Sequence, residues 1–174
     1  MKKRGFELVK RFANSDLKLP QRQTVLSAGY DLEAAEDFVV PSIWKKNFLG
    51  ILQNIFLGKD EKIDNKILNP VLVPTGVKAY MQKNEVLLLI NRSSGPLKRR
   101  LILPNGIGVI DADYYGNEDN DGEIFVQLIN YGLTDYHIKK GERIAQGIFT
   151  SYLLTDNEKE PDKKRTGGFG SSDN

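Results

Sequence analysis

The residues with the clearest chemical potential lie in the stretch NGIGVIDADYYGN, positions 105–117. Asp111 and Asp113 are two residues apart, and residues two apart in a β-strand share a face, so both carboxylates would point the same way beside Tyr114. Two carboxylates that close repel each other unless they hold a cation, a water or a hydroxyl, or unless a turn redirects one of them. The pair is therefore a candidate for metal binding or acid–base chemistry. An acidic strand end running into the acidic loop 117–121 is the simpler explanation when the pair is taken alone.

A second candidate directly follows the apolar run EVLLLI. A strand that ends in Arg92, Ser93, Ser94 and a glycine presents a guanidinium, two hydroxyls and accessible backbone amides at one edge. These groups suit phosphate oxygens, although such a strand end is by itself more often a turn. The stretch AGYDLEAA (28–35) predicts another strand with an acidic residue, and KGERIAQG (140–147) predicts a turn that enters a strand.

Composition excludes several other kinds of site. The 174 residues fit one domain with a substantial core, and the net charge of +2 is too small to indicate a nucleic-acid partner. The chain has no cysteine, which excludes disulfides and thiolate sites and fits a reducing, cytoplasmic compartment. A single histidine, His137, argues against a histidine metal site or a Ser–His triad. Because no segment is long enough to span a membrane, we expect a protein without a membrane partner.

Short apolar runs separated by turn signals predict an all-β fold, either a sandwich or a barrel. From Val71 onward the runs are VLV (71–73), EVLLLI (85–90), RLIL (100–103), GVI (108–110), EIFVQLI (123–129) and RIAQGIF (143–149).

One stretch, residues 42–58, interrupts this pattern. Its apolar residues recur at helical spacing, at positions Trp44, Phe48, Ile51, Leu52 and Ile55. Ser42 is suited to begin a helix and Gly58 to end it, so we predict a helix over about residues 43–57 within an insertion at about 42–66. We expect its apolar face to pack on the β domain, with docking to a protein partner or an interfacial membrane contact as alternatives.

The chain ends in KKRTGGFGSSDN, residues 163–174. So much glycine and serine keeps a segment flexible, and the lone Phe169 cannot build a core. On composition alone this segment is a solvated tail.

The order of these weak signals is more informative than any one of them. AGYDL, RSSG, NGIGVIDADYYG, GERIAQ and RTGGFGSS together resemble the five ordered motifs of the trimeric dUTPase family, over roughly residues 6–172 without the inserted helix. The resemblance implies a dUTP diphosphatase that uses Mg²⁺ to convert dUTP to dUMP and pyrophosphate, which limits uracil in DNA and supplies dUMP. It also implies a distorted jelly-roll-like β-barrel and a homotrimer with active sites between subunits. The chain would divide into a β domain (1–162) and a flexible C-terminal lid (163–174).

The resemblance assigns the acid–base chemistry to the third motif. Asp111 would orient the attacking water and act as the general base towards the α-phosphorus. Tyr114 would pack under the deoxyribose and exclude a ribose. Asn105 and the backbone of a hairpin over residues 105–114, including Gly108, would bind the edge of uracil.

Three other motifs would hold the triphosphate and its metal. Asp31 matches the acid that holds the waters of Mg²⁺, a metal that binds through few protein carboxylates. Arg92 and Ser93 would contact the triphosphate with Ser94 close by, and Gln146 would bind phosphate and water.

The tail would then be a lid that closes over the nucleotide. Phe169 would stack on uracil, Gly170 would let the backbone approach the phosphates, and Ser171 would donate a hydroxyl. The commoner family motif has an arginine five residues before the phenylalanine, where this chain has Lys164. We assign the γ-phosphate clamp to Arg165 instead, because its guanidinium can grip phosphate bidentately.

Two alternatives remain at this point. A dCTP deaminase shares the fold, but it needs a base over the cytosine amine and has no GGFGSS lid. A regulatory or binding protein of the same fold could use the helix at 43–57 as a surface for a protein partner.

Overall fold

The computed structural model describes residues 2–58 and 69–158, apart from the side chains of residues 46–51. Strands dominate this part of the chain. They are β1 (Gly5–Leu8), β2 (Tyr30–Glu33), β3 (Phe38–Val40), β4 (Val71–Pro74), β5 (Val77–Tyr80), β6 (Glu85–Ile90), β7 (Leu101–Ile102), β8 (Gly108–Asp111), β9 (Phe125–Asn130), β10 (Tyr136–Ile138) and β11 (Arg143–Ser151). The helical segments are η1 (Lys10–Phe12), α1 (Ile43–Leu57), η3 (Gly95–Arg99) and η4 (Ala112–Tyr114).

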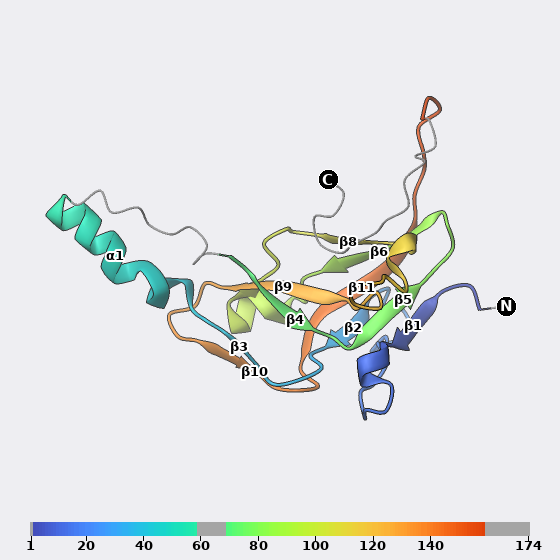
Figure 1. Cartoon of the computed structure of the whole chain (residues 1–174), viewed down its shortest axis with the longest axis horizontal. Helices are drawn as coiled ribbons and strands as arrows, with labels where there is room; N and C mark the ends of the chain where they lie inside the picture. Colours follow the sequence, from blue (N-terminus) through green and yellow to red (C-terminus); the bar gives the residue numbers. More distant parts are fainter. Residues whose placement is uncertain (1, 59–68, 159–174) are drawn as a thin grey trace.

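The strands form antiparallel sheets that enclose one core (Figure 1). A four-stranded sheet has the order β2-β11-β6-β8 and a three-stranded sheet the order β4-β9-β7, while β1 pairs with β5 and β10 with β3. This is the predicted all-β, jelly-roll-like fold. The predicted distorted barrel is not a closed one, because the described sheets do not join into one continuous ladder.

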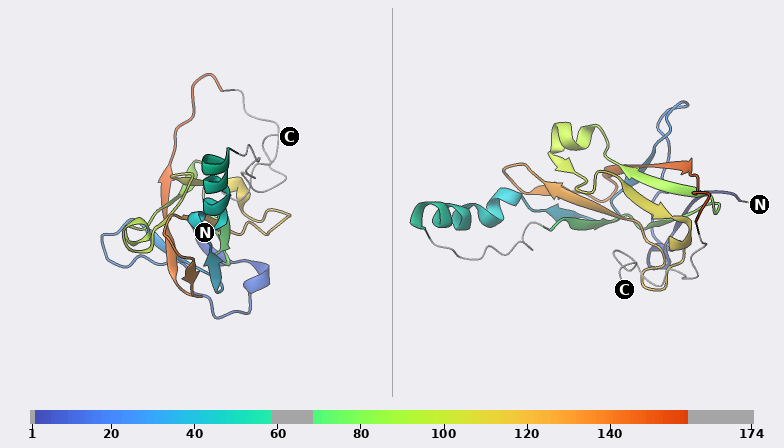
Figure 2. Two further views of the ribbon diagram at one scale, coloured as in Figure 1. Left: turned by 90° about the vertical axis from the view of Figure 1, so that its left-hand side faces the viewer. Right: turned by 90° about the horizontal axis from the view of Figure 1, so that it is seen from above.

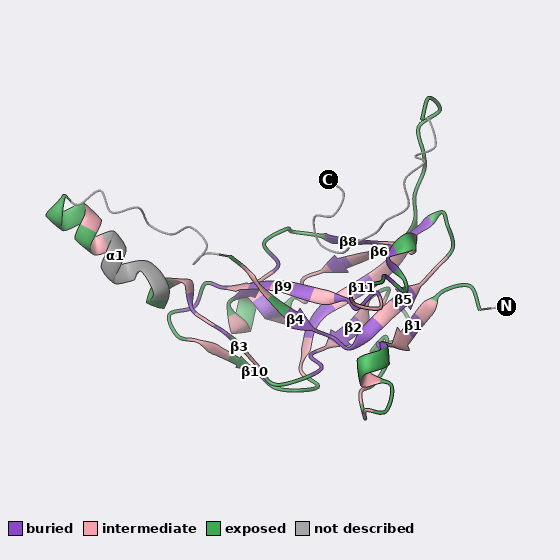
Figure 3. Cartoon of the chain, in the orientation of Figure 1, coloured by how far each residue is buried: buried purple, intermediate pink, exposed green. Residues whose placement is uncertain are grey.

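Alternating burial along the strands builds the core. In β9, every second residue (Val126, Leu128 and Asn130) is buried. Val126 and Leu128 belong to the same hydrophobic core as the fully buried Leu87 of β6. Figure 3 shows the buried residues gathered along the sheets, with exposure increasing towards the far end of α1. The site residues described below are therefore attached to sheets whose inner faces are fixed by packing.

The inserted helix forms as predicted. Ser42 caps α1 by accepting a hydrogen bond from the Trp44 N–H at 3.2 Å, and Gly58 ends it with a left-handed φ of 59°. The helix projects away from the sheets in Figure 1 and in the right view of Figure 2. Ile55, on the predicted apolar face, is 70% exposed, so the expected packing on the β domain is wrong for this residue, and the neighbouring Phe56 and Leu57 are exposed as well. No helix in residues 2–58 or 69–158 is long and apolar enough to cross a membrane.

The N-terminal strand is tied to β6 by an ion pair. Arg4 Nε donates to both carboxylate oxygens of Glu85 at 3.1 Å, and the Gln82 backbone N–H and side-chain amide donate to the same carboxylate at 3.1 and 2.9 Å. The hydrogen bond from Arg4, together with those from Gln82, lowers the pKa of Glu85 from 4.5 to about 2 against the opposing effect of desolvation.

Replacing Glu85 by Gln tests this anchor. Because the folded-state pKa is depressed, the charge of Glu85 stabilises the fold above pH 4.5, and that contribution is lost as the pH falls towards 2. The difference in unfolding free energy between wild type and Glu85→Gln should therefore be largest near neutral pH and shrink between pH 5 and pH 2. Urea titrations across that range measure it, and a pH-independent difference would contradict the assignment.

Candidate active site

Asp31 lies at the centre of the candidate site. This β2 side chain is 2% exposed. Its Oδ1 accepts hydrogen bonds from Arg92 Nε at 2.8 Å and from Gln146 Nε2 at 3.2 Å, and its Oδ2 accepts one from Arg143 Nη1 at 3.3 Å. A buried carboxylate is unfavourable without such partners. The fold thus brings three of the predicted site residues, Asp31, Arg92 and Gln146, into direct contact.

Strand register explains this meeting of distant residues. Asp31 on β2 is opposite Gln146 on β11, and Gln146 is in turn opposite Ile90 on β6. Arg92 follows two residues after Ile90, so its side chain emerges at the same end of the sheet. Gly29 leaves room for the arrangement, since a Cβ there would be 3.1 Å from the Gln146 side-chain oxygen.

Arg143 reaches the same carboxylate because β11 is irregular. Residues three apart in a regular strand face opposite sides, so Arg143 and Gln146 would not share a partner. The register of β11 against β2 shifts between Arg143 and Ala145, and such a bulge re-aims the side chain before it. Sequence reasoning missed Arg143 as a site residue because nothing in GERIAQ marks the bulge.

Arg99 and Glu142 hold the backbone of Arg143 in place. Arg99 Nη1 donates to the Arg143 carbonyl at 2.8 Å and forms an ion pair with Glu142 Oε1 at 3.0 Å. The Tyr136 hydroxyl donates to the same Glu142 oxygen at 2.8 Å, and burial, followed by this hydrogen bond, raises the pKa of Tyr136. Sequence reasoning also missed Arg99, whose one signal is the basic run KRR directly after RSSGPL.

Positive charge is in excess in this cluster, which has three guanidinium groups against two carboxylates. Ser93, exposed, and Ser94, half-buried, lie next to Arg92 in a turn that the Gly95 N–H closes on the Arg92 carbonyl at 2.9 Å. Residues 92–95 are called the phosphate loop below. Guanidinium, hydroxyl and amide donors with a surplus of positive charge can bind a polyphosphate.

The two neighbouring carboxylates of the third motif do not share a strand. β8 ends at the half-buried Asp111, and the 3₁₀ turn η4 begins at the next residue, so Asp113 leaves the strand direction and is exposed. A turn therefore redirects one carboxylate, which is one of the two outcomes that the spacing left open.

Tyr114 closes the same turn from inside the core. It is 4% exposed, its hydroxyl donates to the Glu123 carbonyl at 3.0 Å, and it accepts from the Asn120 side-chain amide at 2.7 Å. These contacts fix the backbone that follows Asp111. A contact between Tyr114 and a sugar stays a prediction.

The predicted tight turn at Asn105 and Gly106 is present. Gly106 donates to the Leu103 carbonyl at 3.0 Å and has a φ of 69°, which favours glycine. The predicted hairpin over residues 105–114 is wrong, because β7 pairs with β9 whereas β8 pairs with β6. The turn instead connects two sheets. Gly108 lets β8 lie close to β6, since a Cβ there would be 3.2 Å from Leu89 Cβ.

The predicted site residues form two separate groups within the chain. Asp111 is opposite Val86 on β6, whereas Asp31 and Gln146 lie level with Ile90. Four residues along a strand correspond to about 13 Å, and two further strands separate β8 from β2. Asp111 and the following Tyr114 therefore lie away from the Asp31 cluster, whereas Asn105 precedes β8 at the end nearer Ile90.

Several predicted residues cannot be placed. The whole predicted lid, residues 163–174, lies outside the described residues, and with it Lys164, Arg165, Phe169, Gly170 and Ser171. The same holds for residues 59–68 of the insertion.

Residues 2–58 and 69–158 contain no group of three or more His, Cys, Asp or Glu residues that could hold a metal directly. Asp31 is buried and already accepts from three donors, so direct coordination by its carboxylate does not fit. Mg²⁺ that arrives on a triphosphate does fit, because such a metal keeps several waters and needs few protein carboxylates. Asp31 could accept from one of those waters once Arg92 or Gln146 turns towards the phosphates.

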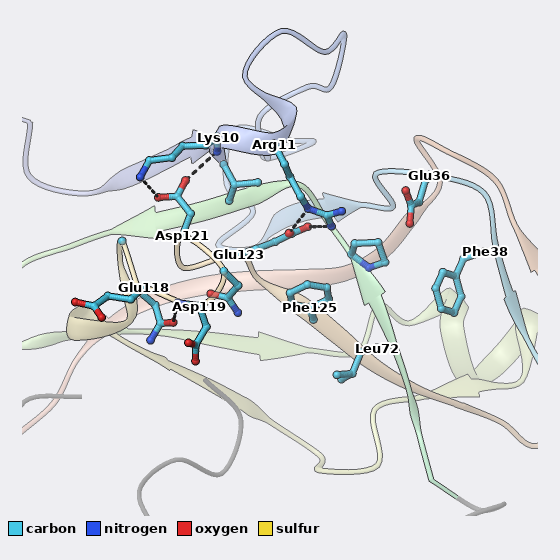
Figure 4. A pocket seen from close by; sticks show the side chains of 15 residues that line it. Lys10, Arg11, Glu36, Phe38, Leu72, Glu118, Asp119, Asp121, Glu123 and Phe125 are labelled. Carbon is cyan, nitrogen blue, oxygen red and sulfur yellow. Dashed lines mark hydrogen bonds and ion pairs between the residues drawn. The ribbon is translucent and has the colours of Figure 1, made fainter. Parts of the chain in front are cut away.

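A separate hollow of about 800 Å³ lies beside loop 116–121 (Figure 4). Its apolar lining includes Phe38, Leu72 and Phe125, and its carboxylates belong to Glu36, Glu118, Asp119, Asp121 and Glu123. Lys10 and Arg11 are paired there with Asp121 and Glu123. The surplus of carboxylates disfavours a triphosphate, and none of the described candidate site residues lines this hollow.

Comparison with known proteins identifies the family. The dUTPase family model matches residues 54–173. The chain is 43% identical over 173 residues to the deoxyuridine 5′-triphosphate nucleotidohydrolase of Lactococcus lactis, covering 99% of both chains, and 32% identical to that of Rickettsia prowazekii, covering 94% of both. The crystal structure of dUTPase from Streptococcus mutans is 41% identical, with a TM-score of 0.70 over 88% of this chain and 99% of that one. A mutant dUTPase from phage phi11 of S. aureus, described with a structural Mg(II) ion, is 17% identical with a TM-score of 0.61 over 93% of this chain and 98% of that one, and it shows the fold alone. The chain belongs to the dUTPase family.

Replacing Asp31 by Asn tests the central role of this carboxylate. The substitution keeps the shape but removes the charge that the two arginines share, so we expect a loss of about 1–3 kcal/mol of unfolding free energy. Asp16→Asn is the matched control, because Asp16 is 82% exposed in its ion pair with Lys140 and should leave stability unchanged within error. Equal stability of the two variants in urea titrations would show that Asp31 does not anchor the cluster.

Proposed function

We propose that the chain is a dUTP diphosphatase that hydrolyses dUTP to dUMP and pyrophosphate. The observation that carries this proposal is the 43% identity to a dUTP nucleotidohydrolase along 99% of both chains. The geometry supports it, because the chain supplies a cationic cluster suited to a triphosphate and a carboxylate on a separate, rigid strand end.

The Asp31 cluster binds the triphosphate in this proposal. Arg92 is held by Asp31 through its Nε, and the hydroxyls of Ser93 and Ser94 and the backbone amides of the phosphate loop add donors. Gln146 contributes its amide from β11. Positioning and charge stabilisation are the main requirements of phosphoryl transfer, and these residues meet them without cysteine or histidine.

Asp111 is the general base. A water attacks the α-phosphorus, its proton passes to the Asp111 carboxylate, and the bond to the bridging oxygen breaks to release pyrophosphate. Asn105 and the backbone at Gly108 hold the uracil edge, and Tyr114 supports the sugar side. Mg²⁺ bound to the triphosphate would neutralise its charge, with Asp31 accepting from a coordinated water.

A complete site requires more than one chain. The general base must lie within hydrogen-bonding distance of the attacking water, yet Asp111 is about 13 Å along the sheet from the level of Gln146. A neighbouring copy can supply the missing half, which supports a homotrimer with sites between subunits. The lid at 163–174, with Arg165, Phe169, Gly170 and Ser171, would complete each site.

A pyrophosphate-release assay with dUTP, dCTP and the other common dNTPs tests the activity. We expect rapid release from dUTP and little from the others. Ammonia release from dCTP without pyrophosphate release from dUTP would instead support the deaminase that shares this fold.

Asp111→Asn should lower kcat at least about 100-fold, because the amide keeps the shape but cannot accept a proton. Binding of dUTP, measured by calorimetry, should change by less than about threefold, since the triphosphate donors are untouched. Asp113→Asn is the matched control, because Asp113 is an exposed residue of η4 and should retain near wild-type turnover. Near wild-type kcat in Asp111→Asn would refute the assignment of the base.

A further inference from the structure

Tyr131 bridges two parts of the chain that none of the five motifs connects. It follows β9, and its side chain is 38% exposed. Its hydroxyl donates to the Pro96 carbonyl at 2.5 Å, and its backbone N–H donates to the Arg100 carbonyl at 3.0 Å. Pro96 lies within η3 and Arg100 directly follows it, so Tyr131 fixes the segment into which the phosphate loop runs.

The phosphate loop is thus held at both ends. Arg92 at its start is bound to Asp31, and Pro96, directly after its end, is bound to Tyr131. A hollow of about 510 Å³ is lined by Ser93, Pro96, Leu97, Arg100 and Tyr131, so the tyrosine and the exposed serine of the loop border one space. Releasing Pro96 would free the end of the loop while Arg92 stays in place.

The base of α1 is attached to the same tyrosine. Trp44 Nε1 donates to the Tyr131 carbonyl at 3.1 Å, and the buried Ser42 donates through Oγ to the Gly132 carbonyl at 2.5 Å. Lys45 adds an ion pair to Asp135 at 3.0 Å. The first turn of the inserted helix is therefore fastened to the loop that positions Tyr131.

We propose that Tyr131 is a positioning residue for the phosphate loop, and that through Tyr131 the placement of α1 acts on triphosphate binding. The proposal rests on the proposed dUTP diphosphatase function. It gives the insertion a mechanical route to the site: Trp44 to the Tyr131 backbone, the Tyr131 hydroxyl to Pro96, and Pro96 to Ser93 and Ser94.

Tyr131→Phe removes the hydroxyl and keeps the ring. We expect KM for dUTP to rise about three- to tenfold with kcat within twofold, because the loop binds substrate without taking part in proton transfer. Inhibition by dUMP should change less, since dUMP lacks the β- and γ-phosphates. Tyr152→Phe is the matched control: its hydroxyl also donates to a backbone carbonyl, that of Lys83, at 2.7 Å and 42% exposure, and its kinetics should match wild type.

The route from α1 is tested by Trp44→Phe, which removes the indole N–H. Trp44→Phe should raise KM for dUTP by a smaller factor than Tyr131→Phe does. The double variant should have the KM of Tyr131→Phe alone, because the hydroxyl that transmits the effect is already absent. If the two substitutions instead multiply their effects on KM, the proposed link between α1 and the phosphate loop is overturned.

The outcomes separate the two proposals. A wild-type protein that does not release pyrophosphate from dUTP overturns the proposed function and this inference with it. An active wild type with an unchanged KM in Tyr131→Phe overturns the inference alone. A Tyr131→Phe protein with a lowered melting temperature and equal losses in KM, kcat and dUMP affinity would show a merely structural role and also overturn it.

Discussion

The buried carboxylate of Asp31 is the constraint on which the rest of the site depends. A charge that is 2% exposed is tolerated only with close partners, and here Arg92, Arg143 and Gln146 supply them. Each comes from a different place in the sequence, so the β2-β11-β6 order and the register of β11 are needed before the cluster can exist. The Asp31 carboxylate orients guanidinium groups, and these outnumber the carboxylates of the cluster. The partners that neutralise Asp31 therefore leave a surplus of positive charge, which suits an anion.

The same sheet that builds this cluster keeps the carboxylate of Asp111, the proposed general base, away from it. Asp111 lies on β8, the strand at the other edge, level with Val86 and not with Ile90. The rigid packing of both sheets prevents the two groups from meeting within one chain. The proposed chemistry therefore requires assembly of copies of the chain. The helix α1 lies outside the sheets that form the core: its first turn is fastened to the loop after β9, and its far end is exposed.

Much of this could be predicted from the sequence, for identifiable reasons. The apolar runs from Val71 to Phe149 became β4, β6, β7, β8, β9 and β11, and Ser42 and Gly58 marked the helix ends, because burial periodicity and capping are local signals. The short strands β1, β3, β5 and β10 were missed, since three or four residues carry too little pattern. Two other features depend on tertiary register, which no local pattern specifies. One is the bulge before Ala145 that brings Arg143 to Asp31, and the other is the pairing of β7 and β8 with different strands. The exposure of α1 was missed because an apolar face does not say what covers it.

The most direct test of the account is complementation between two inactive chains. Arg92→Ala removes a proposed triphosphate donor and Asp111→Asn removes the proposed base, so on this account neither protein alone should turn over dUTP. Co-expressed with different tags and purified on both, mixed trimers should contain sites that join Arg92 of one chain to Asp111 of another. A trimer mixed two to one has about one such intact site in three, so activity should return to about a third of wild type. Mixed trimers that stay inactive would contradict the claim that each site is built from the cluster of one chain and the strand end of its neighbour.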